Sequence, residues 1–110
     1  MRNLLLAAVF LVASVPAEAA VPRSILGTWY FNGDPSAPCR IDYQRNRQAP
    51  LLFTNEKGGT SGGRMIRGGV FAYGWGAAGT GLSAHFTPEG DLLWDNNSVW
   101  TRYPNAPPNP

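Results

Sequence analysis

Short runs of β-forming residues, separated by turn residues, recur along the chain from Ile25 to Arg102. No window in this range repeats its apolar residues with the period of an amphipathic helix. Strong turn signals stand at Asn32-Gly33-Asp34-Pro35 and Pro88-Glu89-Gly90-Asp91. The expected strands before the last hairpin are 25–31, 40–43, 51–54, 64–67, 70–75 and 81–87. About seven short strands joined by sequential turns predict an all-β domain, either a small antiparallel barrel or a sandwich.

The last two strands are expected to form a hairpin through a two-residue turn at Asn96-Asn97, because asparagine tolerates the positive φ of such turns. In this register Trp94 faces Val99, and Leu93 faces Trp100. Trp94 and Val99 then lie on an apolar face. Trp100 is expected on the opposite, more polar face.

The N-terminus has the pattern of a cleaved signal peptide covering residues 1–19. One basic residue, Arg2, precedes the apolar run Leu4 to Val15, and Ala17-Glu18-Ala19 supplies small residues for cleavage. The apolar run of about a dozen residues is shorter than the roughly 20 that a spanning helix needs. We therefore expect export to the periplasm or the cell exterior, no membrane span, and a single β-domain over residues 20–103.

The C-terminal residues 104–110 read Pro-Asn-Ala-Pro-Pro-Asn-Pro. A segment so rich in proline lacks the N–H donors of a regular ladder. We expect it to be an extended, disordered tail.

The chain has one cysteine, Cys39, so it cannot form a disulfide within itself. Cys39, Ile41 and Tyr43 alternate with polar residues, which places the thiol on the apolar side of a strand. A buried thiol and a monomer are expected. The alternative is a dimer linked through Cys39. The aromatic residues are expected to replace disulfides in stabilising the core.

Net charge and polar residues argue against several classes of function. Nine basic and seven acidic residues give a net charge of +2, and their scattered positions do not predict nucleic-acid binding. His85 is the only histidine, so neither a metal site nor a Cys–His pair is predicted. Gly74 to Gly79 has dinucleotide-binding spacing, but a strand follows it where that motif needs a helix. We expect no cofactor and no enzymatic activity.

One group of aromatic and basic residues is a candidate binding site: Trp100, Arg102 and Tyr103, together with Tyr73 and Trp75 of an earlier strand. Aromatic rings and a guanidinium on a sheet face can stack on a sugar or anchor a partner. The alternative is a Trp–Arg stack that closes one end of a barrel.

These features lead to a primary hypothesis of a non-catalytic exported module that binds a glycan or small ligand. The first alternative is an inhibitor of a secreted hydrolase, with Val21 to Ser24 as its inserting arm. The second alternative is an uncharacterised enzyme.

Two weak resemblances concern the ends of the domain. Gly27-Thr28-Trp29, with Trp100-Thr101-Arg102 near the end, resembles the Gly-x-Trp first strand of calycin barrels such as lipocalins and avidins. That resemblance implies a tryptophan packed against an arginine from a late strand. Gly27-x-Trp29 followed by Cys39-x-Ile41 resembles bacterial periplasmic metalloprotease inhibitors, which are also short exported barrels. Those inhibitors pair the first cysteine with a second, which this chain lacks.

A third resemblance spans most of the domain. Gly27-Thr28-Trp29, the run from Phe53 to Gly63, Trp94-x-Asn96 and Trp100-x-Arg102 resemble small uncharacterised bacterial exported proteins. It implies an exported β-domain and no particular activity.

Overall fold

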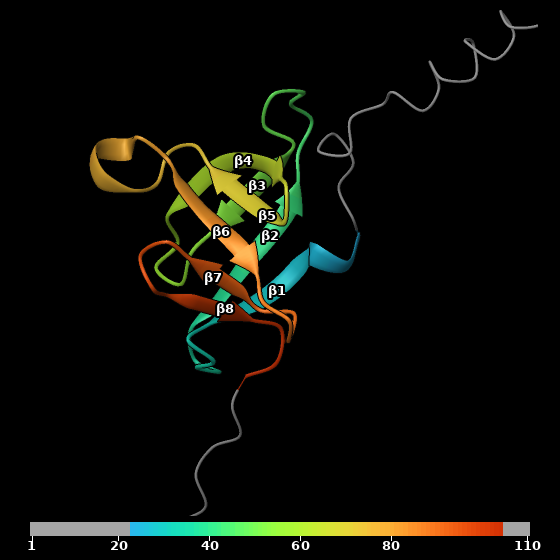
Figure 1. Ribbon diagram of the computed structural model, residues 1–110, viewed down its shortest axis with the longest axis vertical. Coiled ribbons are helices and arrows are strands. Elements are labelled where there is room, and N and C mark those ends of the chain that lie inside the picture. Colours follow the sequence, from blue (N-terminus) through green and yellow to red (C-terminus); the bar gives the residue numbers. More distant parts are fainter. Residues whose placement is uncertain (1–22, 105–110) are drawn as a thin grey trace, which may run out of the picture.

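The protein is a closed antiparallel β-barrel, seen in a computed structural model that describes residues 23–104. Each strand pairs with the next in the chain, and the last strand returns to pair with the first (Figure 1). The strands are β1 Gly27–Phe31, β2 Pro38–Tyr43, β3 Leu51–Thr54, β4 Thr60–Ile66, β5 Gly69–Ala72, β6 Leu82–Phe86, β7 Leu92–Trp94 and β8 Val99–Thr101. Two short 3-10 helices, η2 Arg23–Ile25 and η3 Ala77–Gly79, complete the described chain.

The predicted all-β class is confirmed, and the barrel is the form adopted. The described residues form eight strands, which correspond to the six expected before the last hairpin and the two of the hairpin, so the expected total of about seven was one too low. The signal peptide predicted over residues 1–19 lies outside the described residues, as does the tail beyond Pro104. No helix in the described range is long and apolar enough to cross a membrane.

Strand limits depart from the sequence-based expectation at the glycines. β4 begins at Thr60 and runs through Gly62 and Gly63, so the predicted strand 64–67 was too short. β5 ends at Ala72, three residues before the predicted limit of its strand. Glycine weakens strand propensity, yet β4 includes Gly63 because a Cβ there would collide with the Phe53 ring and the Phe71 carbonyl oxygen.

Alternation along the strands fills the barrel with large side chains. The buried hydrophobic residues are Ile25, Trp29, Cys39, Ile41, Leu51, Phe53, Met65, Val70, Ala72, Ala84, Leu92, Trp94 and Trp100. Cys39 is only 1% exposed, so the expectation of a buried thiol is confirmed. A disulfide to a second chain would require the barrel to open around this residue.

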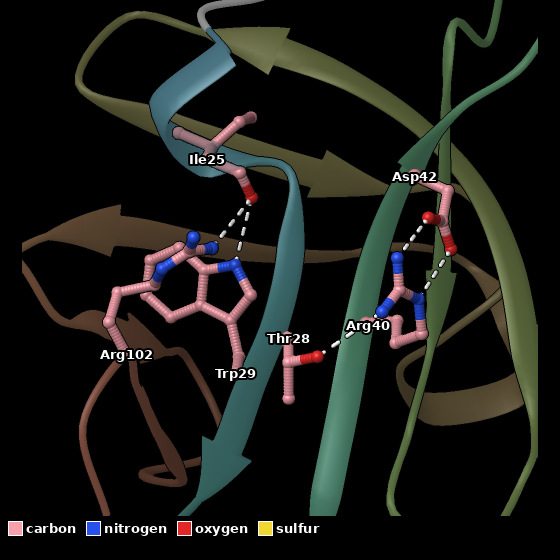
Figure 2. Close-up of polar contacts among 6 residues, drawn as sticks. All are labelled: Ile25, Thr28, Trp29, Arg40, Asp42 and Arg102. Atoms are coloured by element: carbon pink, nitrogen blue, oxygen red, sulfur yellow. Dashed lines mark hydrogen bonds and ion pairs between the residues drawn. The ribbon is translucent and has the colours of Figure 1, made fainter.

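One end of the barrel is closed by a tryptophan, an arginine and helix η2 (Figure 2). The indole N–H of Trp29 donates a 2.8 Å hydrogen bond to the carbonyl oxygen of Ile25. The guanidinium of Arg102 lies 4.9 Å from the centroid of the Trp29 ring and also donates to the Ile25 carbonyl, at 3.4 Å. This group ties the start of β1 to the end of β8, and we call its side of the barrel the closed end.

The predicted register of the last hairpin was wrong by one residue. Leu92 pairs with Trp100 and Leu93 with Val99, while the Trp94 N–H donates to the Ser98 carbonyl at 2.9 Å. The loop therefore has three residues, with Asn97 at a φ of 71°. A one-residue shift in pairing exchanges the two faces of a strand. Trp100 consequently lies in the interior, 2% exposed, and Val99 takes the outer position.

Candidate functional site

A pocket of about 610 Å³ opens at the end of the barrel opposite the closed end. In an antiparallel barrel of sequential strands, the loops after β1, β3, β5 and β7 meet at the same end, which we call the loop end. The pocket lies among these four loops. Its apolar lining is Phe31, Trp75, Leu82, Trp94 and Trp100, and its polar side chains are Asn32, Asn55, Glu56, Asn96, Asn97 and Ser98. The volume falls within the usual range for small-molecule sites.

Three tryptophans form the apolar floor of the pocket. The ring centroids of Trp94 and Trp100 are 5.1 Å apart, and that of Trp75 lies 5.6 Å and 6.0 Å from them. All three pairs meet edge to face, the favourable geometry for aromatic rings. Trp94 and Trp100 are each 2% exposed, whereas Trp75 is only partly buried. Trp75 is therefore the outermost ring of the cluster.

The position of Trp75 is set by two glycines and a buried serine. The N–H of Gly74 donates to the Ser61 hydroxyl oxygen at 2.9 Å, and that hydroxyl donates to the Gly62 carbonyl at 2.8 Å. Gly76 has a φ of 95°, a backbone conformation that residues with a side chain rarely adopt. The chain thus leaves the strand direction at Gly74 and brings Trp75 over the mouth of the barrel.

The indole N–H of Trp94 is buried and has no hydrogen-bond partner among residues 23–104. A buried donor without a partner costs about 1–3 kcal/mol. Native proteins rarely keep such a group unless something else satisfies it. Trp94 is also one of the residues that line the pocket.

Three asparagines at the rim accept hydrogen bonds through their side-chain oxygens: Asn55 and Asn96 hold their own turns, and Asn32 joins its loop to β8. Asn32 Oδ1 accepts from the Val99 N–H at 3.0 Å. Asn55 Oδ1 accepts from two backbone N–H groups of the β3–β4 turn, at 3.0 and 2.7 Å. Asn96 Oδ1 accepts from both the N–H and the hydroxyl of Ser98, at 3.0 and 2.6 Å. The rim is therefore made of tight turns whose asparagines are fixed in orientation.

Glu56 is the one charged residue among the described residues that line the pocket. Burial raises the pKa of the Cys39 thiol to about 12, and the negative charge of Glu56 adds to this effect. The same carboxylate gives the pocket a negative rather than a positive character. No lysine or arginine lines it within the described range.

The five residues predicted as one site are divided between three places. Trp75 and Trp100 lie together in the pocket. Tyr73 lies outside the barrel, where its ring meets Phe71 and its hydroxyl donates to the Gln48 carbonyl at 2.9 Å. Arg102 packs on Trp29 at the closed end, as the alternative interpretation of a Trp–Arg stack predicts. Tyr103 follows Arg102 and is 83% exposed.

The other residues singled out in the sequence lie outside the pocket lining or only at its edge. Gly74 to Gly79 lies in the loop between two antiparallel strands, β5 and β6. His85 is exposed on β6, whereas Cys39 is buried. Within residues 23–104, no three His, Cys, Asp or Glu side chains lie close enough together to hold a metal ion. The inhibitor arm begins outside the described residues, and its Arg23 and Ser24 start η2 at the closed end.

The rim residues Asn32, Asn55, Glu56 and Asn96 were not predicted as site residues. A usable signal was present, because each lies in or beside a turn that follows an odd-numbered strand. Such turns share one end of any closed barrel of sequential antiparallel strands. To recognise this site from the sequence, one would have to know that the barrel closes and which turns follow odd-numbered strands.

Searches against family models, curated proteins and solved structures find no match to this chain. The chemistry of the pocket residues is therefore the basis for inferring function.

Proposed function

We propose that the protein is an exported, non-catalytic binding module that takes a glycan or another small ligand in the loop-end pocket. The buried Trp94 N–H without a protein partner carries this proposal, because it lies in an aromatic pocket of ligand size. A ligand oxygen that reached this N–H would satisfy a donor that no described protein group satisfies.

The pocket supplies both components of small-molecule affinity. Burial of apolar ligand surface against Trp75, Leu82 and Phe31 contributes about 25 cal/mol per Å². The asparagine rim provides directional groups that give orientation and specificity. Eight-stranded barrels also have an interior of the right width to hold one small ligand at the mouth.

Export is part of the proposal and rests on the N-terminal sequence. Arg2, the apolar run from Leu4 to Val15 and Ala17-Glu18-Ala19 are the parts of a cleaved signal peptide. The ligand would then be met in the periplasm or outside the cell, where glycans are abundant. The resemblance to small bacterial exported proteins supports the same placement.

The test compares two aromatic residues that are two positions apart in sequence. Trp75 is the outermost ring of the tryptophan cluster in the pocket, whereas Tyr73 lies on the outer surface of the barrel. We expect Trp75→Ala to weaken binding of a neutral apolar dye, N-phenyl-1-naphthylamine, and of N-acetylglucosamine trimer by tenfold or more for whichever binds. Tyr73→Ala should change either affinity less than twofold. Affinity is measured by fluorescence titration and calorimetry of the purified protein.

Thermal unfolding of both variants is the control for folding. If neither probe binds the wild-type protein, or if both variants bind like wild type, the proposed function is wrong. Equal losses in the two variants would also contradict it, because the effect would then lie outside the pocket.

A further inference from the structure

The side-chain nitrogens of three rim asparagines have no hydrogen-bond partner in the described part of the chain. In Asn32, Asn55 and Asn96 the side-chain oxygen accepts from a backbone N–H, so the amide cannot be flipped without losing that bond. The Nδ2 group of each remains a donor, and all three residues line the pocket. None of the three Nδ2 groups has a hydrogen-bond partner among residues 23–104.

These donors and the other pocket groups restrict the charge of a ligand. A cation would be attracted by Glu56 and by the aromatic rings, but it could not accept from the N–H groups of Asn32, Asn55, Asn96 and Trp94. An anion would suit those donors but would meet Glu56, with no lysine or arginine among the described lining residues. An uncharged ligand with several acceptor oxygens avoids both conflicts.

The shape and polarity of the pocket favour one class of uncharged molecule. A sugar ring has an apolar C–H face that can lie on an aromatic ring such as Trp75, which is partly exposed. Its hydroxyl and carbonyl oxygens accept hydrogen bonds, and its hydroxyl groups also donate to a carboxylate such as Glu56. A neutral saccharide is thus complementary to the aromatic floor, the amide donors and the one carboxylate acceptor of the pocket.

We infer that the ligand is an uncharged saccharide whose oxygens accept from the Nδ2 groups of Asn32, Asn55 and Asn96. This inference rests on the proposed binding function and specifies its ligand. The ring of the sugar lies against Trp75, and one hydroxyl donates to Glu56. The buried N–H of Trp94, another residue of the pocket lining, is a further donor for the same ligand.

Replacement of asparagine by aspartate tests the donors without removing the turns. In Asn55→Asp and Asn96→Asp, a carboxylate oxygen still accepts the backbone N–H groups that hold each loop. The Nδ2 donor is replaced by an acceptor oxygen, and each variant also gains one negative charge, as the control does. Asn46→Asp is the matched control, since Asn46 Oδ1 also accepts from backbone N–H groups and Asn46 does not line the pocket.

We expect each rim variant to bind N-acetylglucosamine trimer roughly threefold to tenfold more weakly, as loss of one hydrogen bond implies. The double variant should lose at least tenfold, and Asn46→Asp should stay within twofold of wild type. Thermal unfolding midpoints verify that the turns persist in every variant. Equal affinity in rim variants and control would overturn the role of the asparagines.

Ligand charge is tested with trimers of similar size. N-acetylglucosamine trimer is neutral, glucosamine trimer is cationic and galacturonic acid trimer is anionic. Maltotriose and cellotriose extend the neutral group. We expect at least one neutral trimer to bind at least tenfold more tightly than either charged trimer, by calorimetry at low salt.

Binding of a charged trimer as tightly as every neutral one would overturn the inference. If no saccharide binds but N-phenyl-1-naphthylamine binds in a manner that depends on Trp75, the saccharide class is wrong and the proposed binding function stands. If no probe binds, both fail.

Discussion

Two buried indoles, those of Trp29 and Trp94, have opposite environments in this barrel. The N–H of Trp29 is bonded to the Ile25 carbonyl, and its ring is covered by Arg102. The N–H of Trp94 has no partner in the described chain, although its side chain is equally buried. Buried polar groups are normally satisfied. This difference between single residues separates a structural tryptophan from one assigned to a ligand.

Trp100 is a poor residue with which to test binding, because it is part of the core. Its ring packs on Phe53 and Trp94 at centroid distances of 6.4 and 5.1 Å. We expect Trp100→Ala to lower the free energy of unfolding by about 3–5 kcal/mol, measured by urea denaturation. A loss below about 1 kcal/mol would show that the register with Trp100 inside is wrong.

Because the thiol of Cys39 is buried, we expect the stability of the protein to depend on pH in the alkaline range. Burial and then the charge of Glu56 raise the pKa of its thiol from 9.0 to about 12. Above pH 9 the unfolded chain loses this proton while the folded protein keeps it, so folding becomes less favourable as pH rises toward 12. The slope approaches about 1.4 kcal/mol per pH unit.

The measurement is the free energy of unfolding of wild type and Cys39→Ala between pH 8 and pH 11, by urea denaturation. Other titrating groups are common to both proteins, so the difference isolates the thiol. The contribution of the protonated Cys39 thiol to the free energy of unfolding is fully present below pH 9 and is lost as the pH rises toward 12. Parallel curves for the two proteins would contradict the burial of Cys39.

At the scale of single elements, β4 shows how neighbouring glycines can have different roles. Gly63 faces the interior, and a Cβ there would collide with the Phe53 ring and the Phe71 carbonyl oxygen. Gly62 faces outward, where a Cβ would lie 3.2 Å from the Cβ of Ala49 in the β2–β3 loop. Only the first collision involves groups fixed by the core.

We expect Gly63→Ala to lower the free energy of unfolding by about 3 kcal/mol or more, as overpacking of a rigid site does. Gly62→Ala is the matched control and should cost under about 1 kcal/mol, because a surface loop can shift. Urea denaturation of both variants provides the measurement. A more severe loss in Gly62→Ala would reverse the assignment of faces on β4.

The last hairpin shows where sequence-based reasoning about elements ends. Its strands were predicted, but two-residue and three-residue loops are both compatible with Asp95-Asn96-Asn97. The choice depends on the whole sheet, since β8 must also pair with β1, placing Trp100 opposite Phe31. The pairing of β8 with β1 cannot be predicted from the residues of the hairpin alone. The resulting shift of one residue moved Trp100 from the outer face to the core.

Tyr73 and Trp75 illustrate a second limit, at the end of a strand. Residues two positions apart share a face only while the strand continues. The buried Ala72 places Tyr73 outside, but the chain turns at Gly74, and Trp75 enters the pocket. The sequence named two of the three pocket tryptophans, Trp75 and Trp100, as binding candidates. It could not separate them from Tyr73, Arg102 and Tyr103, because their separation follows from barrel closure.

At the scale of the whole molecule, the barrel has a closed end and a loop end with different tasks. The closed end joins both ends of the domain through Trp29, Arg102 and Ile25. The loop end carries the aromatic pocket and the asparagine rim. Under the proposed function, the closed end and the strands are the rigid scaffold on which the binding loops stand.

Substitutions of Arg102 test whether stability at the closed end and binding at the loop end are independent. We expect Arg102→Ala to lower the free energy of unfolding by about 1–2 kcal/mol through loss of the stack on Trp29. Arg102→Lys should recover only part of this, because lysine lacks the planar group. Binding of N-phenyl-1-naphthylamine or N-acetylglucosamine trimer should remain within twofold of wild type in both variants, at temperatures where they are folded. Loss of binding without loss of stability would instead place Arg102 in the site.

The most direct measurement is a ¹H–¹⁵N NMR titration that follows the four indole N–H signals. On addition of the tightest-binding neutral trimer, or of N-phenyl-1-naphthylamine if none binds, we expect the Trp94 signal to shift and the Trp75 and Trp100 signals to move with it. A ligand acceptor on Trp94 should also slow exchange of its N–H with solvent. The Trp29 signal is the internal control and should stay unchanged, because its N–H is already bonded to Ile25 at the other end. A saturating ligand that moves Trp29 and leaves Trp94 and Trp75 unchanged would contradict a binding site at the loop end.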